Sequence, residues 1–315
     1  MGQLLTFQEF TAGGRPQGGS IPELLLDFVE NVSPIDRPAL ALFKKSRVTG
    51  TFVEWQEDNL PARGYNAFNE GVAETNPDLT TPSRTFAHVQ LFAKWGQVSD
   101  VQRAVNHKGF SDAFLYQEKK NVDSLLNDVE HTLHRGSAAT GATSAPRQLG
   151  GLLNILTTNF TNACGITLTE EIYNDLIQQF VDNSTDIRPT AVFVNSWLTR
   201  TLSLYSTKVT RNVEASARVQ ELVIEQHKSD FGDVFKYYSR DQLKSTAKTS
   251  SGNSIVLLDP SFFETGWLQP LMSEVLPRTG LRTSFQISAM CTLIYRTQKA
   301  GGGGINYVPY IPPAT

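Results

Sequence analysis

The stretch that decides the fold runs from Ser111 to Gly136 and reads SDAFLYQEKKNVDSLLNDVEHTLHRG. Its apolar residues recur every three or four positions, which predicts one long amphipathic helix. Ser111 is expected to cap its start, with Asp112 favoured by the helix dipole, and Gly136 to end it. From Ser111 to Arg135 it would be roughly 37 Å long. An apolar stripe of that length needs a sheet or a partner along all of it. Its members are Phe114, Leu115, Val122, Leu125, Leu126, Val129 and Leu133.

Upstream of this helix the apolar period changes to two, which is typical of half-buried strands. Thr51 to Gln56 alternates in this way and is expected to pair with a strand from Ala87 to Trp95, while residues 58–83 form a long loop at the tip. A surface hairpin of a single domain explains this pattern as well as a hairpin that lies on a neighbouring subunit. The apolar face is expected to hold Ala87, Val89, Leu91, Ala93 and Trp95.

Two further segments flank this region. Residues 1–48 have a Gly-rich start and a short apolar stretch at Leu24–Val29, which predicts an extended arm with a short helix. Arms of this kind are usually ordered only against a neighbour. The segment from Gly136 to Gly151 is rich in Gly, Ala, Ser and Thr and is expected to be a mobile loop. Arm, hairpin and lone helix together indicate a protein that assembles.

Beyond residue 151 helices alternate with short strands, which favours a mixed α/β or α+β domain. The run Gly301–Gly304 is expected to be a flexible crossing between strands rather than a phosphate-binding loop. The other predicted elements are helices capped by Thr169 and by Ser196, buried strands at Ala191–Val194 and Ile255–Leu258, and a strand–turn–strand at 221–226 and 234–238 with Gly232 in the connection.

The composition is that of a folded protein with an ordinary core, since 40% of its 315 residues are hydrophobic and 19% are charged. The net charge of −3 argues against a protein that grips nucleic-acid phosphates. No apolar run is long enough for a membrane span, and the start lacks the features of a signal peptide. Cys164 and Cys291 are too few for a disulfide framework, so both are expected to be buried, reduced thiols in a cytoplasmic protein.

The segment 130–134 is the one cluster of residues that resembles a metal site. A zinc hydrolase helix needs two histidines four apart with a glutamate between them, whereas His131 and His134 are three apart and Glu130 precedes both. A structural or solvent-facing role is therefore favoured, and no catalytic, cofactor or metal residues are expected. A metal-dependent hydrolase using the two histidines is the remote alternative. Asp123, Asp128 and Glu130 are expected on a solvated or subunit-facing side of the helix.

The order of arm, hairpin, long helix, glycine-rich loop and α/β domain resembles the major capsid proteins of tailed bacteriophages with the Hong Kong 97 fold. Gln269 and Arg278 stand where that pattern would have Arg and Lys, which weakens a salt-bridge role at Gln269 more than it weakens the fold. The resemblance rests on Ser33-Pro34-Ile35-Asp36-Arg37-Pro38, Glu54-Trp55-Gln56 with Asp58 and Leu60, Gln97-Val98-Ser99 with Gln102, Ala104-Val105 and Gly109, Asp128-Val129-Glu130, Gly150-Gly151-Leu152, Asp259-Pro260, Trp267-Leu268-Gln269-Pro270, Leu276-Pro277-Arg278-Thr279-Gly280 and the strand 284–295.

This resemblance implies an α+β fold and a shell-forming function. The chain would assemble through hexamers and pentamers into a head enclosing double-stranded DNA, without sequence-specific binding, cofactor or membrane. It would act with a portal protein, with room for scaffolding and decoration proteins, in a virion assembled in the bacterial cytoplasm. An encapsulin-like compartment is the alternative with the same fold. The implied divisions are the arm (1–48), the extended-loop hairpin (49–98), the spine helix and glycine-rich loop of the peripheral domain (99–150), the axial domain (151–280), a peripheral strand (281–298) and a C-terminal axial segment (299–315).

The resemblance also implies where subunits touch. The hairpin would lie over an adjacent subunit and bury Trp55 and Trp95 partly against it. Gly109 and Gly136 are the hinge candidates. Lys94 has no identifiable partner for a covalent cross-link, so none is predicted. The expected inter-subunit contacts are Trp55, Gln56, Asp58, Lys94, Trp95, Arg135, Arg147 and Arg278.

Overall fold

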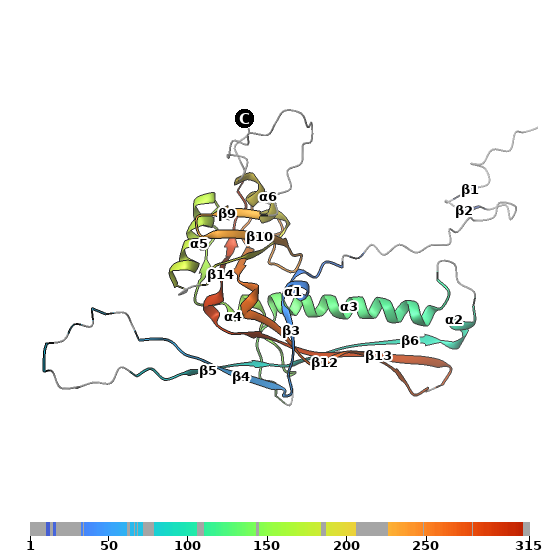
Figure 1. Ribbon diagram of the computed structural model, residues 1–315. Coiled ribbons are helices and arrows are strands. Elements are labelled where there is room, and N and C mark those ends of the chain that lie inside the picture. The colour runs from blue at the N-terminus through green and yellow to red at the C-terminus, as the bar shows by residue number, and fades with distance from the viewer. Residues whose placement is uncertain are drawn as a thin grey trace, which may run out of the picture.

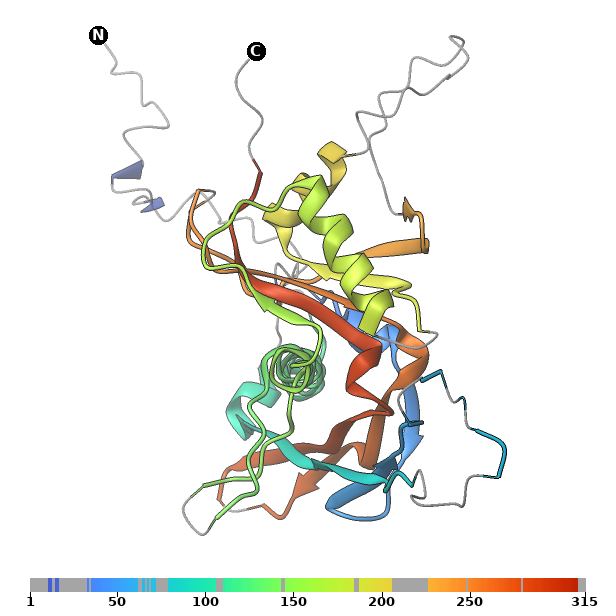
Figure 2. The ribbon, with the colours of Figure 1, turned by 90° about the vertical axis from the view of Figure 1, so that its left-hand side faces the viewer.

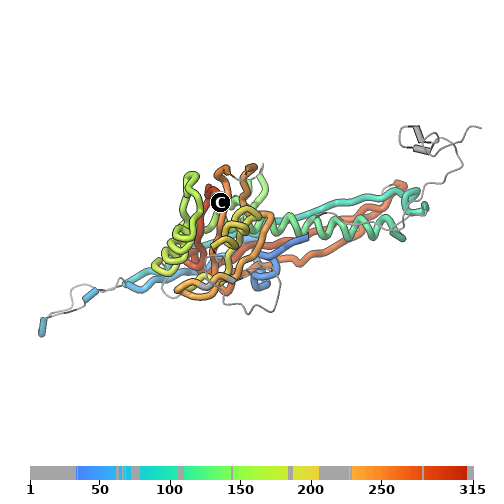
Figure 3. The backbone as a smooth tube through the Cα atoms, turned by 90° about the horizontal axis from the view of Figure 1, so that it is seen from above, coloured from blue at the N-terminus to red at the C-terminus, as the bar shows by residue number. Residues whose placement is uncertain are grey.

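A long helix between two sheets forms the body of the protein (Figures 1 and 2). Helix α3 (Ala113–Arg135) has a four-stranded sheet below it and, at its C-terminal end, a six-stranded sheet above it. Seen from above, the molecule is elongated, with the hairpin β4–β5 at one end and the tip of the four-stranded sheet, called the long sheet below, at the other (Figure 3). The computed structural model describes residues 11–12, 15–16, 33, 35–61, 64–65, 67, 69–71, 79–105, 110–142, 145–183, 187–205, 226–247, 249–278 and 280–310.

The four-stranded sheet has the order β3-β12-β13-β6. Its strands are β3 (Lys44–Arg47), β12 (Phe263–Leu276), β13 (Arg282–Tyr295) and β6 (Gln90–Ser99), and all neighbours are antiparallel except β3 and β12. Because β12 lies beside β13, residues 263–276 belong with this sheet and not with the axial domain, where the expected division placed them. Residues 44–47, expected in the arm, also belong to this sheet.

Helix α3 is about 34 Å long at 1.5 Å per residue. Its cap is Asp112, whose Oδ1 accepts a hydrogen bond from Phe114 N at 2.8 Å, so the prediction of Ser111 was wrong by one residue. Most of the predicted stripe faces the core, but Leu115 is exposed. The apolar stripe of α3 is covered within the subunit, because it packs against both sheets.

The predicted strand from Ala87 to Trp95 is two strands in two different sheets. Strand β4 (Phe52–Glu57) pairs with β5 (Ser83–His88), and the ladder ends where Val89 N donates to Thr51 O. After this break β6 joins the four-stranded sheet, and its even-numbered rather than its odd-numbered residues face the core. A one-residue shift exchanges the two faces of a strand. Phe92 and Val98 are therefore buried, whereas Leu91 and Trp95, predicted inward, are exposed.

The six-stranded sheet, called the axial sheet below after the domain expected there, has the order β7-β14-β11-β8-β10-β9. It contains both parallel and antiparallel pairs of strands. Helices α5 (Glu170–Asn183) and α6 (Ser196–Tyr205) cover one face and α3 packs on the other, which explains why all four residues of β8 (Ala191–Val194) are buried. The cap of α6 is Asn195, not the predicted Ser196. The remaining strands are β7 (Phe160–Asn162), β9 (Gln226–Ser229), β10 (Gly232–Tyr238), β11 (Asn253–Leu258) and β14 (Gly301–Tyr307).

The run Gly301–Gly304 begins the buried strand β14, between β11 and β7, so the prediction of a flexible crossing was wrong. Neighbouring groups approach so closely that side chains have no room there. A Cβ on Gly301 would lie 2.4 Å from Leu156 Cδ2, and one on Gly303, whose φ is +142°, would lie 2.1 Å from Ile255 O. Glycine is required in this strand for close packing, not for flexibility.

The segment from Gly136 to Gly151, predicted to be a mobile loop, contains paired backbone hydrogen bonds within its described residues. Ala139 pairs with Gln148 in both directions, and Gly151 N donates to Gly136 O at 2.8 Å. The remaining elements are β1 (Thr11–Ala12), β2 (Arg15–Pro16), α1 (Pro38–Leu42), α2 (Asp100–Ala104), α4 (Leu152–Ile155), η3 (Pro260–Phe262) and η4 (Gln298–Ala300).

Three smaller expectations also have an outcome. Cys291 is buried as predicted, but Cys164 is exposed. No helix in the described part of the chain is long and apolar enough to cross a membrane. The helix expected at Leu24–Val29, the hinge candidate Gly109 and the strand residues 221–225 lie outside the described residues.

Candidate assembly surfaces

The hairpin β4–β5 has two different faces. On the inner face, the Trp55 ring meets Tyr295 edge-on, with ring centroids 5.0 Å apart, and is partly buried against the core of its own subunit. On the outer face, Phe52 and Phe86 stack at 5.3 Å although they are 45% and 52% exposed. A pair of large exposed rings on a projecting hairpin is a surface that another protein would cover.

The outer edge of β5 is also open. Because Val89 N bonds to Thr51 O, the alternating pattern directs the backbone groups of Arg84 and Phe86 away from β4. Within the described residues no strand pairs with this edge, although the next carbonyl along it, that of His88, accepts from Thr292 Oγ1 at 2.9 Å. An open edge of this kind can accept an added strand.

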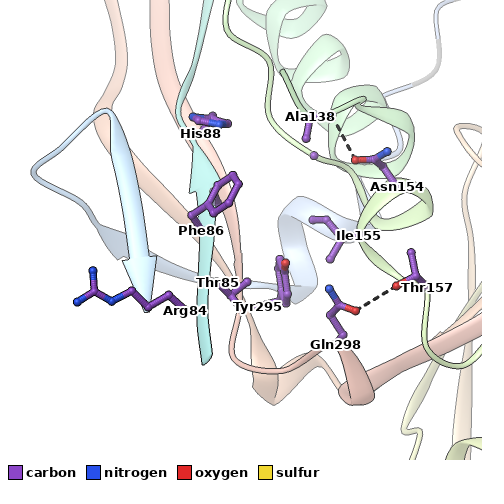
Figure 4. A pocket seen from close by; sticks show the side chains of 12 residues that line it. Arg84, Thr85, Phe86, His88, Ala138, Asn154, Ile155, Thr157, Tyr295 and Gln298 are labelled. Carbon is purple, nitrogen blue, oxygen red and sulfur yellow. Dashed lines mark hydrogen bonds between the residues drawn. The ribbon is translucent and has the colours of Figure 1, made fainter. Parts of the chain in front are cut away.

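A groove of about 380 Å³ runs along this edge (Figure 4). Its far wall is formed by the 136–151 loop, α4 and η4, where Asn154 Oδ1 accepts from Ala138 N and Thr157 Oγ1 donates to Gln298 Oε1. The His88 side chain in the groove is 7% exposed, and its Nε2 atom has no hydrogen-bond partner within the described residues. The groove therefore offers apolar side chains and open backbone groups, whereas the Nε2 atom of His88 is itself buried. Its lining residues are Arg84, Thr85, Phe86, Ala87, His88, Ala138, Gly150, Asn154, Ile155, Thr157, Tyr295 and Gln298.

The segment Asp36–Leu40 fastens the start of the described body to α3. Arg37 donates to Asn127 Oδ1 at 2.8 Å and to the backbone and side-chain oxygens of Asp123. Glu130, which was expected on a solvated or subunit-facing side, is instead fully buried. Its Oε1 and Oε2 accept from Ala39 N at 2.8 Å and Leu40 N at 2.9 Å. The segments that contain two of the resemblance motifs, 33–38 and 128–130, thus lie side by side.

The two histidines of α3 face different surroundings. His131 is exposed and its Nδ1 lies 2.9 Å from Asp241 Oδ1, whereas His134 is buried and contacts Glu130 and Ser239 through Nε2. Within the described residues no three His, Cys, Asp or Glu side chains are grouped so that they could hold a metal ion. The helix therefore uses this cluster to hold neighbouring elements.

The other expected contact residues are spread over the molecule. Lys94 pairs with Asp128 at 2.5 Å, and the Trp95 indole, 67% exposed, donates to Gln286 Oε1 at 3.3 Å. Arg135 donates to Asp241 O at 2.5 Å and Gln242 O at 2.7 Å.

At the hairpin, Gln56 and Asp58 are exposed, and Asp58 Oδ1 accepts from Asn59 N. Arg147 is exposed on the 136–151 loop, and Arg278 pairs with Asp100 at the far end of the long sheet. The expected contact residues therefore do not lie together in one site.

Two further expectations concern packing and pairing. A Cβ on Gly136 would lie 2.6 Å from Leu149 O, so close packing explains this glycine. Gln269 donates from Nε2 to Met272 Sδ and forms no salt bridge. Sequence reasoning missed Phe52, Phe86 and His88. The available signal was an aromatic residue at even positions of both strands, on the face that otherwise reads as polar.

Comparison with known proteins decides the family. The sequence profile of the SU10 major capsid protein matches residues 3–306. The chain belongs to this capsid protein family. The major capsid protein of Escherichia phage Phieco32 is 26% identical over 115 residues, which are 36% of this chain and 33% of that protein. The match to this curated relative therefore spans about a third of its length.

Solved structures share the fold at low identity. The capsid of a native GTA particle has a TM-score of 0.65 and 13% identity, covering 94% of this chain and 97% of its own. The capsid of cyanophage A-1(L) has a TM-score of 0.66 and 11% identity, with coverages of 92% and 98%. An encapsulin complex from Synechococcus elongatus has a TM-score of 0.59 and 10% identity, with coverages of 95% and 96%. These matches confirm the predicted capsid fold of the Hong Kong 97 type.

Proposed function

We propose that this chain is the major building block of the head shell of a tailed bacteriophage, a structural role without catalysis. It would assemble through hexamers and pentamers around double-stranded DNA. The observation that carries the proposal is the hairpin, which projects from the body with exposed rings on one face and an open strand edge. The membership of the capsid family supports the same function.

We further propose that the groove beside β5 receives an extended segment of a neighbouring copy. Backbone hydrogen bonds to Arg84 and Phe86 would give affinity without demanding a particular sequence. The rings of Phe52 and Phe86 would lose water on the outer face. Each contact can be modest, because a closed shell repeats it many times.

The remaining expectations follow from the same proposal. The chain would sit in the virion after assembly in the bacterial cytoplasm, together with a portal protein and with room for scaffolding and decoration proteins. All eight expected inter-subunit contact residues remain proposals. Five of them are exposed on the subunit, namely Gln56, Asp58, Trp95, Arg147 and Arg278, and the other three are Trp55, Lys94 and Arg135. Gly109 and Gly136 remain proposed hinges. The arm, hairpin, peripheral and axial divisions are proposed with the β12 boundary moved as described above.

An encapsulin-like compartment is the second candidate, because an encapsulin complex shares this fold over 95% of the chain. The two candidates differ in what the shell encloses. Particles purified from infected or producing cells should contain double-stranded DNA if the first is right, and protein cargo if the second is right.

Assembly itself is tested by size-exclusion chromatography of the recombinant full-length chain, with light scattering and electron microscopy. Closed shells, or rings of five and six subunits, are the expected result. A monomer that persists under crowding conditions would contradict the proposed function.

A further inference from the structure

We infer that the buried Glu130–His134 pair couples the docking of the N-terminal arm to the position of the axial domain. The pair stands at the end of α3, where α1 and the 239–242 loop after β10 meet. Within the described residues no hydrogen bond joins a buried group of α1 to the 239–242 loop, whereas both elements contact this pair. The coupling is a property of one chain, and its use during shell assembly rests on the proposed function.

On the arm side, α1 depends on α3 for its cap. It has only five residues, and its N-cap residue, Arg37, makes no side-chain hydrogen bond to the helix. So short a helix is not stable on its own. The carboxylate of Glu130 supplies the missing cap by accepting from Ala39 N and Leu40 N.

On the axial side, hydrogen bonds determine which ring nitrogen of His134 carries the proton. Ser254 Oγ accepts from Leu243 N, so its hydroxyl donates to Gln242 Oε1 at 2.6 Å. The other end of that amide, Nε2, then donates to His134 Nδ1 at 2.9 Å. The ring proton is therefore on Nε2, which faces Glu130 Oε1 at 3.2 Å and Ser239 Oγ at 3.1 Å.

One oxygen atom consequently serves both sides. Glu130 Oε1 accepts from the arm at Ala39 N and from His134, whose ring is held by the axial residues Ser239 and Gln242. If the axial loop moves, His134 loses two partners in a site with no solvent exposure, and Glu130 is no longer held in place for the arm. Losing a hydrogen-bond partner at a buried polar group is costly, so the two docking events must influence each other.

Other links between the same elements lie at the surface. Asp36 pairs with Arg240 at 3.2 Å, and His131 lies 2.9 Å from Asp241. Solvent-exposed ion pairs contribute little to stability. They provide matched controls, because Arg240 and Asp241 belong to the same loop as Ser239 but do not touch Glu130 or His134 through their side chains.

The test is hydrogen exchange, measured by mass spectrometry on the full-length unassembled chain, for the amides of Ala39 and Leu40. Ser239→Ala and Gln242→Ala should each speed this exchange about five-fold or more, although neither side chain touches α1. Asp241→Asn and Arg240→Ala should change it less than two-fold. If only Glu130→Gln speeds it, the arm is held by Glu130 alone and the coupling is absent.

A double-mutant cycle covers the case in which a variant loosens the whole fold. The effects of Ser239→Ala and Glu130→Gln on arm exchange should be clearly non-additive, because both act on one hydrogen-bonded pair. Additive effects would overturn the inference. Light scattering of the wild-type chain tests assembly separately, so a chain that never assembles would refute the proposed function and leave the coupling standing.

Discussion

The axial sheet and the hairpin β4–β5 are built from the same kind of strand but differ in how complete they are. In the axial sheet, β8 is covered on both faces, and the glycines of β14 lie in contact with neighbours on all sides. In the hairpin, one face packs on the subunit through Trp55, while the other exposes Phe52 and Phe86 beside an open edge. One region completes its own core. The other leaves a face and an edge open, and we propose that a second molecule covers them.

The largest expected effect on subunit stability comes from adding a methyl group inside the axial sheet. Gly303→Ala should destabilise the unassembled subunit by about 2–5 kcal/mol, because its Cβ would meet the backbone at Ile255 and its φ is positive. Urea unfolding measures the loss. Gly64→Ala in the hairpin tip is the control, since nothing lies within 4 Å of its added Cβ. A Gly303 variant as stable as the control would mean that β14 is not tightly packed.

The next effect separates the two tryptophans that were expected to contact a neighbour. Trp55→Ala should cost about 2 kcal/mol in the unassembled subunit, because this ring packs against Tyr295. Trp95→Ala should cost less than about 0.5 kcal/mol, because that ring is largely exposed. Chemical denaturation of both variants checks this. Equal losses would remove the distinction between the inner hairpin face and the exposed face of the long sheet.

The outer hairpin face should matter more for assembly than for folding. Replacing both Phe52 and Phe86 by Ser should cost about 1–2 kcal/mol of subunit stability, since the rings are half exposed but stack on each other. Shell yield, measured by sedimentation, should fall strongly. Leu115→Ser on α3 is a control with a similarly exposed apolar residue. Normal shells from the double variant would contradict the role given to this face.

The smallest effect is a pH-dependent one at the loop end of the β4–β5 pairing. Burial raises the pKa of Glu57, opposed by the neighbouring Trp55 indole and by the charge of Lys299. A raised folded-state pKa means that the stabilising contribution is present below the ordinary value of 4.5 and is lost as pH rises through the folded-state value. Glu57→Gln should therefore raise the melting temperature at about pH 7 and have little effect at about pH 4. A gain of the same size at both values would exclude this titration.

What the sequence could predict was set by local pattern. The long helix, β8 and β11 follow from the spacing of their own apolar residues. Glu130 was misjudged because its partners, Ala39 and Leu40, are about ninety positions away. The glycine run was misjudged for the same reason, since its neighbours Leu156 and Ile255 come from other strands and loops.

The candidate site was predicted in part. The alternation placed Trp55 on one face of a projecting hairpin, and the structure agrees. The open edge at Arg84 and Phe86 could not be predicted, because it depends on where Val89 ends the ladder. A single residue there decides which strand belongs to the hairpin and which to the long sheet. The spacing of apolar residues alone does not show that the chain passes from one sheet to another.

The most direct test of this comparison is hydrogen exchange at the amides of Arg84 and Phe86, in free subunits and in assembled shells. We expect rapid exchange in the free subunit and strong protection in the shell, with β11 amides protected equally in both. Exchange at β5 that is equally rapid in both states would show that no neighbour completes this edge of the hairpin.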